Sequence, residues 1–253
     1  MHNPAAFSLA GKTAVVTGGG RGLGLGISTA LLEAGADVIV FARSEVPAEL
    51  TADATSLGRR LEFVALDLAD SDAIAAAAAK VLAAHRVDIL VNNAGTQDRY
   101  PAVDFPLEAF DQVMDINLRA VFQLCQLFGR PMLERGEGKI VNLASLLSFQ
   151  GGATVPAYAA SKGAVAQLTK ALCNEWSSRG VNVNAVAPGY MATDMNTALI
   201  ADPVRMEHLS VRIPAGRWGQ PEDIGNVVVF LASPAAAYVH GQVLAVDGGW
   251  LAR

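Results

Sequence analysis

Tyr158 and Lys162 stand four residues apart in the stretch VPAYAASKGAVA (155–166), whose other residues are small or apolar. Residues four apart lie on the same face of an α-helix, so the phenol and the ammonium can share one small space. A neighbouring ammonium favours the phenolate and lowers the phenol pKa from about 10. The pair therefore predicts proton transfer near neutral pH. For an isolated Tyr-x3-Lys, the alternative is a half-exposed pair whose lysine reaches out to water.

A glycine-rich run, Thr17-Gly18-Gly19-Gly20-Arg21-Gly22-Leu23-Gly24, follows the apolar segment 13–18 and opens a helical pattern. Backbone N–H groups in such a turn can approach a pyrophosphate at the positive end of the helix. The spacing is T-G-x3-G-x-G instead of the commoner G-x-G-x-x-G. A tight turn that packs a helix on a sheet is the alternative, but the position between strand and helix predicts nucleotide binding.

The elements that would position these residues alternate along the chain. Short runs rich in Val, Ile and Leu predict strands at 13–18, 37–42, 61–66, 88–93, 139–144, 181–186 and 243–248. Helical patterns lie between them, near 22–34, 46–57, 71–85, 107–134, 156–179 and 221–232. This alternation predicts an α/β fold: a doubly wound, parallel, seven-stranded Rossmann-like sheet with helices on both faces. We expect one domain over 1–253, with a lid-like substrate loop at about 189–220 and a second loop at 143–157.

Composition narrows the class of protein. The 253 residues are 52% hydrophobic and 17% charged, with a net charge of −5, which describes a compact globule without a basic patch for nucleic acid. We expect no metal site, because the four histidines lack ligand spacing, and we expect free, buried thiols at Cys125 and Cys173. The first residues lack the pattern of a signal peptide, and no apolar run is long enough to span a membrane. These features predict a soluble, cytoplasmic protein.

Together the motifs resemble the classical short-chain dehydrogenase/reductase family across essentially the whole chain. The resemblance rests on Thr17-Gly18, Gly22 and Gly24, on Asn92-Asn93-Ala94-Gly95, and on Asn117, Ser145, Tyr158 and Lys162, in order and with the usual spacings. The segments SFQGGATVPAYAASK, NVNAVAPGYMAT, RIPAGRWG and VDGGWLAR resemble a branch that acts on 2-dehydro-3-deoxy-D-gluconate or 2-deoxy-D-gluconate. The resemblance implies an enzyme of carbohydrate metabolism, an oxidoreductase that interconverts a secondary alcohol and a ketone.

The resemblance also implies a catalytic role for each of four residues. Tyr158 would exchange the proton, and Lys162 would act as its electrostatic partner and bind the nicotinamide ribose. Ser145 would hold the substrate oxygen, although a serine there could also cap a turn. Asn117 would distort its helix and hold a water that relays protons from Lys162; a buried amide satisfied by backbone is the alternative.

For the cofactor the resemblance implies NAD(P)(H), bound by three groups of residues. These are the glycine loop with Gly18, Arg21, Gly22, Leu23 and Gly24; the adenine and ribose side with Arg43, Asp67, Leu68, Asn93, Ala94 and Gly95; and Pro188, Gly189 and Thr193 near the carboxamide, in addition to Tyr158 and Lys162. Asp67 and Thr193 could instead be turn residues. Ala42 stands where an acid would select NAD, and Arg43 and Arg21 could clamp a 2′-phosphate, so the residues favour NADP(H). The branch generally uses NAD(H), and Arg43 could stack on adenine, so both cofactors stay open.

The expected substrate is a deoxy-keto sugar acid, whose carboxylate needs a cation. Three arginines that could supply this cation lie in segments that could line the pocket: Arg99, Arg205 and Arg212. Arg99 ranks first because it follows the Asn-Asn-Ala-Gly turn directly, and Gln150, Tyr190 and Met195 are further candidates. A 3-oxoacyl thioester reductase of the same family and a non-catalytic nucleotide-binding scaffold are the alternatives. The family usually forms tetramers, so we expect a homotetramer, with the apolar stretch 118–129 and Trp250 as candidate contacts between subunits.

Overall fold

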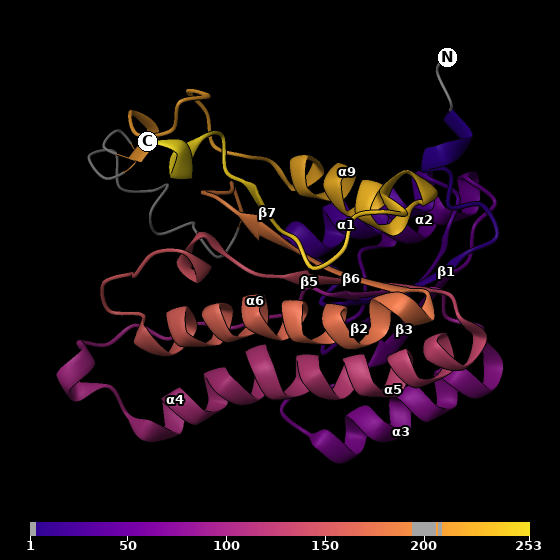
Figure 1. Cartoon of the computed structure of the whole chain (residues 1–253), viewed down its shortest axis with the longest axis horizontal. Coiled ribbons are helices and arrows are strands. Elements are labelled where there is room, and N and C mark those ends of the chain that lie inside the picture. The colour runs from indigo at the N-terminus through magenta and orange to yellow at the C-terminus, as the bar shows by residue number, and fades with distance from the viewer. Residues whose placement is uncertain (1–3, 194–205, 207–208) are drawn as a thin grey trace.

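The computed structural model describes residues 4–193, 206 and 209–253. Its strands form one parallel sheet in the order β3-β2-β1-β4-β5-β6-β7 (Figure 1). The strands are β1 (Thr13–Thr17), β2 (Asp37–Ala42), β3 (Leu61–Ala65), β4 (Ile89–Asn92), β5 (Gly138–Leu143), β6 (Val181–Pro188) and β7 (Val243–Val246). The predicted parallel seven-stranded sheet is confirmed, with every strand end close to its predicted position.

The helices also follow the predicted pattern. They are α1 (Gly22–Glu33), α2 (Ala48–Ser56), α3 (Ser71–Ala84), α4 (Leu107–Met114), α5 (Ala120–Arg135), α6 (Pro156–Trp176) and α9 (Pro221–Ala232). Local chemistry sets several ends: the Asp70 carboxylate accepts the backbone N–H groups of Asp72 and Ala73 at the start of α3, and Gly136 ends α5 in the left-handed conformation. A π-helical segment, η3 (Asp115–Arg119), joins α4 to α5 within the predicted helix 107–134.

Short 3-10 helices complete the chain at η1 (Pro4–Phe7), η2 (Ala102–Asp104), η4 (Leu146–Ser148), η5 (Ser177–Arg179), η7 (Pro234–Ala236) and η8 (Trp250–Ala252). Two of them bear on the site described below. The helix η4 follows β5 directly, and η8 follows β7.

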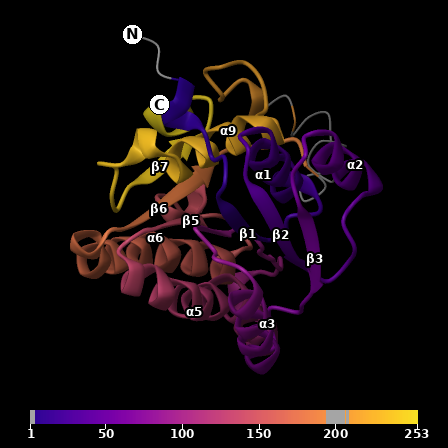
Figure 2. The same ribbon diagram turned by 90° about the vertical axis from the view of Figure 1, so that its right-hand side faces the viewer.

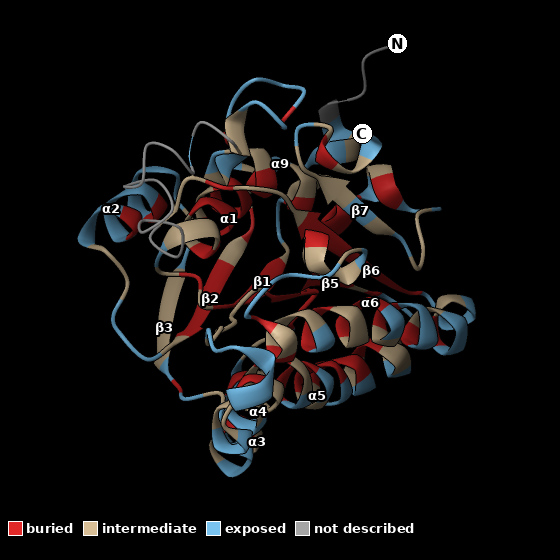
Figure 3. Ribbon diagram, turned by 90° about the vertical axis from the view of Figure 1, so that its left-hand side faces the viewer, coloured by how far each residue is buried: buried red, intermediate tan, exposed pale blue. Residues whose placement is uncertain are grey.

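Helices cover both faces of the sheet, with α1, α2 and α9 on one side and α3, α4, α5 and α6 on the other (Figures 1 and 2). Successive residues of a strand point to opposite faces of the sheet and so belong to two separate hydrophobic cores. In β1, Ala14 and Val16 pack toward α1 and α9, whereas Val15 packs toward α3 and α5. The central strands are buried on both sides (Figure 3), which explains why their sequences are apolar throughout.

The strand order places a topological switch between β1 and β4. From β1 the chain proceeds outward through β2 to β3, whereas from β4 it proceeds the other way through β5 to β7. Connections that leave the neighbouring strands β1 and β4 therefore diverge. In open α/β sheets ligands bind at such a point, beyond the carboxyl ends of the strands.

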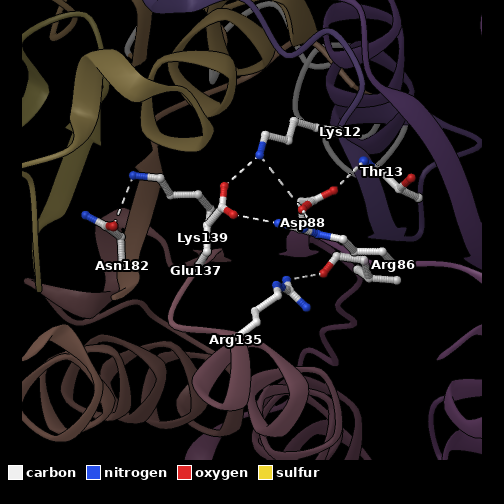
Figure 4. Close-up of polar contacts among 9 residues, drawn as sticks. Lys12, Thr13, Arg86, Asp88, Arg135, Glu137, Lys139 and Asn182 are labelled. Atoms are coloured by element: carbon white, nitrogen blue, oxygen red, sulfur yellow. Dashed lines mark hydrogen bonds and ion pairs between the residues drawn. The ribbon is translucent and has the colours of Figure 1, made fainter. Parts of the chain in front are cut away.

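The opposite, amino edge of the sheet is tied together by charged side chains (Figure 4). Asp88 accepts the backbone N–H of Thr13 at 3.1 Å and Nε of Arg86 at 2.9 Å. Glu137 accepts Nζ of Lys12 at 2.6 Å, a hydrogen bond that lowers the pKa of the Glu137 carboxyl, with Arg86 as its second donor. The network extends to Arg135, Lys139 and Asn182. It joins segments that precede β1, β4 and β5, so the charges at this edge are satisfied mainly by one another.

Both cysteines are free thiols, as the sequence predicts. Cys125 is fully buried, and burial raises the pKa of its thiol to about 12. Cys173 is only partly buried, so the prediction of burial is wrong for that residue. In the part of the chain that the structure describes, no helix combines the length and the apolar character needed to cross a membrane.

Candidate active site

The turns after β1 and β4 are joined by a compact hydrogen-bond network at the topological switch. The hydroxyl of Thr17, the last residue of β1, accepts the backbone N–H groups of Asn93 and Ala94, both at 3.0 Å. The Asn93 amide in turn donates to the carbonyl of Thr17 at 2.9 Å. The glycine run and the Asn-Asn-Ala-Gly turn therefore lie side by side, as a shared dinucleotide site requires.

The glycine run has the geometry of a phosphate cradle. Gly18 and Gly22 adopt φ of +65° and +50°, and a Cβ at Gly24 would lie only 1.9 Å from the carbonyl oxygen of Gly18. Helix α1 starts without a side-chain cap from Arg21, so its first N–H groups remain available to an anion. Across the open side, a Cβ at Gly22 would meet Thr193 at 3.8 Å. These residues fit the pyrophosphate of a dinucleotide.

The predicted adenine-side residues follow the neighbouring strands β2 and β3. Arg43 comes directly after β2 and, like Arg21, is exposed; neither guanidinium has an ion pair with a described residue. The Asp67 carboxylate accepts the backbone N–H of Ala69 at 3.0 Å, so this residue has the turn role that the sequence left open. Leu68 is partly buried against the core beside α3.

The segment after β6 returns to the same edge of the sheet. Pro188 ends β6, and Gly189 donates its N–H to the carbonyl of Val246 at 2.9 Å. A Cβ at Gly189 would lie 2.6 Å from the Cα atom of Asp247, which explains the need for glycine in this close approach of β6 and β7. The segment predicted to contact the nicotinamide carboxamide is thus held in place by backbone pairing with the end of β7.

The two ends of the predicted lid segment 189–220 pair with each other. Met191 forms a bridge with Gly219, whose carbonyl accepts the N–H of Ala192 at 2.8 Å. The segment therefore leaves the sheet edge and returns to it at one place. Two candidate residues of this segment, Met195 and Arg205, lie outside the described residues.

Ser145 and Tyr158 lie within hydrogen-bond distance, with Ser145 just beyond β5 and Tyr158 in the first turns of α6. The Ser145 hydroxyl also accepts the N–H of Leu147 at 3.2 Å and so starts η4. It therefore has the capping role that the sequence left open, and its contact with the substrate oxygen stays a prediction. Ser148 completes the connection by donating to the carbonyl of Lys162 at 2.7 Å, which holds α6 against this loop.

Lys162 is buried, with 4% of its surface exposed, and its amine donates to the carbonyl of Leu143 at 2.5 Å. Nζ also lies 5.7 Å from the centroid of the Tyr158 ring. Burial lowers the pKa of Lys162 to about 8. Burial likewise raises the pKa of Tyr158, against the opposing effect of the hydrogen bond from Ser145.

The pair is thus brought together as predicted, but Lys162 alone does not lower the pKa of Tyr158; the further lowering expected from a bound, positively charged nicotinamide ring stays a prediction. Two physical reasons account for the difference. Desolvation penalises the phenolate more than its neighbours stabilise it, and the amine of Lys162 is engaged by Leu143 instead of the phenol.

Asn117 is fully buried inside the π-helical segment, so the predicted distortion of the helix is confirmed. Its Oδ1 accepts the N–H of Thr96 at 2.8 Å, and its Nδ2 donates to the carbonyl of Thr96 at 2.9 Å and to Ser161 at 3.1 Å. A Cβ at Gly95 would lie 3.2 Å from Oδ1 of Asn117 and 3.7 Å from Nζ of Lys162. Glycine therefore lets the turn after β4 approach the amide and the amine closely.

The residues predicted to contact substrate gather around Trp250. The indole Nε1 donates to Oε1 of Gln150 at 3.3 Å, and the ring centroids of Tyr190 and Trp250 are 4.7 Å apart. Burial raises the pKa of Tyr190, while the charges of Arg212 and Arg99 lower it, so both guanidiniums act on this phenol. Trp250 is 5% exposed within its own chain, so most of its side chain packs inside the subunit, and a contact with a neighbouring subunit stays a prediction.

Sequence reasoning missed several of these contributions. Ser148 and Ser161 connect the catalytic residues to each other, and Trp250 organises the substrate side. For Ser161 a signal existed: it stands three residues after Tyr158 on the same helix and donates to the Tyr158 carbonyl at 2.8 Å. For Trp250 no spacing pattern could have identified its partners.

Comparison with known proteins agrees with this geometry. A family model described as enoyl-(acyl carrier protein) reductase matches residues 18–251. The chain is 52% identical to a 2-dehydro-3-deoxy-D-gluconate 5-dehydrogenase of Bacillus subtilis and 47% identical to one of Escherichia coli, in each case over 98% of both chains. The crystal structure of a gluconate 5-dehydrogenase from Burkholderia cenocepacia, in complex with NADP and tartrate, is 40% identical over the full length of both chains, with a TM-score of 0.94.

Replacing the buried amine should stabilise the protein. Because the pKa of Lys162 is about 8 in the folded protein and 10.5 in an exposed lysine, the unfolded state binds the proton more tightly, and stability rises with pH between these values. The difference corresponds to about 3 kcal/mol at pH 7, offset by about 1 kcal/mol for the lost hydrogen bond. We expect Lys162→Met to unfold at higher denaturant concentration than wild type at pH 7, with the gain shrinking above pH 8.

Urea titrations at several pH values measure this gain. Lys170→Met is the matched control, because Lys170 lies on the same helix but is exposed and donates only to Gln167. A Lys162→Met protein that is less stable than wild type at pH 7 would show that the amine is not the buried, costly charge described above.

Proposed function

The chain belongs to the short-chain dehydrogenase/reductase family, and we propose that it interconverts a secondary alcohol and a ketone on a deoxy-keto sugar acid, as an NAD(P)-dependent oxidoreductase. The convergence of Ser145, Tyr158 and Lys162 beside the glycine cradle carries this proposal. The curated relatives named above act on 2-dehydro-3-deoxy-D-gluconate, which supports the same substrate class here.

The cofactor site would be built by residues from both sides of the topological switch. The pyrophosphate would be bound by Gly18, Gly22, Leu23 and Gly24, and the ribose side would be lined by Asn93, Ala94 and Gly95. Asp67 and Leu68 would lie at the adenine end of the cofactor, and Pro188, Gly189 and Thr193 at the carboxamide end. A bound nicotinamide supplies the carbon that accepts or returns the hydride. The close approach of Gly95 to Asn117 and Lys162 supports this placement, because it brings the ribose side next to the proton-transfer residues.

Proton transfer would be the task of the chain's own side chains. In ketone reduction Tyr158 Oη donates its proton to the substrate oxygen, and the raised pKa keeps the phenol protonated at neutral pH for that step. In alcohol oxidation the same atom accepts the proton, and the nearby ammonium of Lys162 stabilises the phenolate that precedes it. Ser145 holds the substrate oxygen against the phenol. Asn117 fixes Thr96 and Ser161 around the amine.

The substrate carboxylate would be bound by Arg99 together with Gln150 and Tyr190, which both contact Trp250. Arg99 has no carboxylate partner among the described residues, and its charge reaches the phenol of Tyr190. An unpaired guanidinium close to a partly buried phenol suits a carboxylate, which accepts charge-assisted hydrogen bonds from both. An acyl thioester carries no carboxylate at the corresponding position, so this cation favours the sugar acid.

We further propose that the single domain over 1–253 acts in the cytoplasm as a homotetramer. Apolar side chains are exposed beside α4 and α5, where Val103 is 91% exposed and Leu107 and Phe122 lie nearby in sequence. Strand β7 leaves one edge of the sheet uncovered, with Leu244 exposed. Analytical ultracentrifugation measures the assembly, and a monomer at micromolar concentration would contradict the proposal.

The catalytic assignment predicts the behaviour of Tyr158→Phe. Because the variant keeps the ring but lacks the transferable proton, we expect kcat to fall by about 10²–10⁴-fold, with dinucleotide affinity within a few-fold of wild type. Steady-state kinetics with 2-dehydro-3-deoxy-D-gluconate, 2-deoxy-D-gluconate and a 3-oxoacyl thioester measure both activity and substrate class. Tyr100→Phe, which changes a phenol outside the site, should behave as wild type. Activity confined to the thioester, or full turnover by Tyr158→Phe, would overturn the proposal.

The cofactor preference follows from the unpaired cations after β1 and β2. We propose that Arg43, with Arg21, binds a 2′-phosphate, which the NADP complex of the Burkholderia relative supports. Arg43→Ala should raise KM for NADP by roughly 10-fold or more and leave KM for NAD within about 3-fold, because only the phosphate contact is lost. Arg60→Ala is the control, since Arg60 pairs with Asp37 at the amino end of β2. An equal loss for both cofactors would instead indicate that Arg43 contacts the adenine they share.

A further inference from the structure

The turn that follows β7 is a rigid platform for one large side chain. The Asp247 carboxylate accepts the N–H groups of Gly249 and Leu251, both at 2.9 Å, and so folds the chain into η8. This turn carries Trp250 into a small apolar cluster with Leu146, Ile213 and Trp218. Leu146 directly follows Ser145, so the indole is packed against the loop that bears a catalytic residue.

The Trp250 indole contacts three polar side chains, those of Arg212, Tyr190 and Gln150. The guanidinium carbon of Arg212 lies 4.0 Å from the ring centroid, within the range of a cation–π contact. The ring of Tyr190 packs at 4.7 Å, and the indole N–H donates to Gln150 at 3.3 Å. These partners come from separate loops, one after β5, one after β6 and one before α9. Trp250 is their common point of attachment.

Stacking leaves Arg212 able to bind an anion. A guanidinium that lies over an aromatic ring uses its face, and its N–H donors all lie in its plane, where they can grip a carboxylate with two parallel hydrogen bonds. Arg212 has no acidic partner among the described residues, in contrast to Arg217 five positions later, which pairs with Asp223 at 2.7 Å. The backbone beside it is held as well, because Arg253 donates to the carbonyl of Val211 at 3.0 Å.

The same indole orients the amide of Gln150. An indole N–H can only donate, so the amide must present its oxygen, Oε1, to Trp250. The NH₂ group is then left with two N–H donors that bond to no described residue. A guanidinium, an amide and a phenol are thus held around one ring, and all of them are donors to an anionic ligand.

We propose that Trp250 is a positioning residue for substrate recognition, and that Arg212, held flat on its ring, binds the carboxylate of the sugar acid together with Arg99. This inference rests on the proposed function, because it assigns the acid group of that substrate class. It adds a second cation and explains how an exposed, flexible arginine is restricted to one orientation. The charges of Arg99 and Arg212 both reach Tyr190, which supports their acting on one ligand.

The test compares an acid with its neutral counterpart. For each protein we would measure KM and kcat with 2-deoxy-D-gluconate and with 2-deoxy-D-glucitol, in which the carboxylate is reduced to an alcohol. Arg212→Gln should raise KM for the acid 10-fold or more, with KM for the alditol within 2-fold, kcat little changed and dinucleotide affinity unchanged. Arg217→Gln is the matched control, because that arginine is already paired with Asp223. For Arg217→Gln, the ratio of KM for the acid to KM for the alditol should equal that of wild type.

Trp250 is tested by two substitutions. Trp250→Leu removes the flat ring and should raise KM for the acid selectively, whereas Trp250→Phe restores a ring face and should recover a substantial part of the loss. A general packing defect would change both substrates alike and would not be rescued, and that result would overturn the positioning role. The thermal unfolding of each variant is measured in parallel, so that the ratio of KM for the acid to KM for the alditol is compared among folded proteins only.

The outcomes separate this inference from the function on which it rests. A wild-type enzyme that does not prefer the acid over the alditol would contradict the proposed substrate class itself. A wild-type enzyme that prefers the acid, combined with an Arg212→Gln variant that keeps the full preference, would overturn only the present inference. In that second case Arg99→Gln alone should abolish the preference.

Discussion

A nearly buried lysine amine that faces no carboxylate among the described residues sets the conditions for the whole site. Its burial disfavours the ammonium, and the main compensation is one carbonyl at the end of β5, that of Leu143. Such a charge persists only where the surroundings are rigid enough to hold it. The surrounding serines supply that rigidity, because Ser148 ties α6 to the loop after β5 and Ser161 ties it to Asn117. Stability is given up at this position so that a cation lies beside the phenol.

The position of that lysine depends in turn on the order of the strands. The connections after β1 and β4 diverge, and the Thr17 hydroxyl joins them by accepting two backbone hydrogen bonds, from Asn93 and Ala94. Gly95 lies next to this junction, close to both the amide of Asn117 and the amine of Lys162. A dinucleotide held in the glycine cradle would therefore reach the proton-transfer residues without any rearrangement of the sheet. The chemistry and the cofactor cradle share one edge because the topology brings their strands together.

Periodicity and local motifs were sufficient for the sheet, the helices and the pairing of Tyr158 with Lys162, because each of these depends on neighbours in sequence. The strands are continuous apolar runs, and Tyr158 and Lys162 share a helix face. The remaining features of the site depend on tertiary contacts. The direction of the Lys162 amine depends on a carbonyl in another element, and the partners of Trp250 come from three loops, so no spacing in the sequence reveals them. The balance between desolvation and hydrogen bonding at Tyr158 is likewise a property of the packed site.

The two edges of the sheet differ in how their charged side chains are paired. At the amino edge Lys12 and Arg86 are engaged with Asp88 and Glu137, whereas at the carboxyl edge Arg21, Arg43, Arg99 and Arg212 have no acidic partner among the described residues. A chain with a net charge of −5 thus leaves four cations without an acidic partner at the edge where the anionic cofactor and substrate are proposed to bind. Unpaired cations of this kind attract anionic molecules and so raise the frequency of productive encounters. Added salt weakens that attraction over distances of about 10 Å, so the enzyme's capture of dilute anions is sensitive to ionic strength even where its chemistry is not.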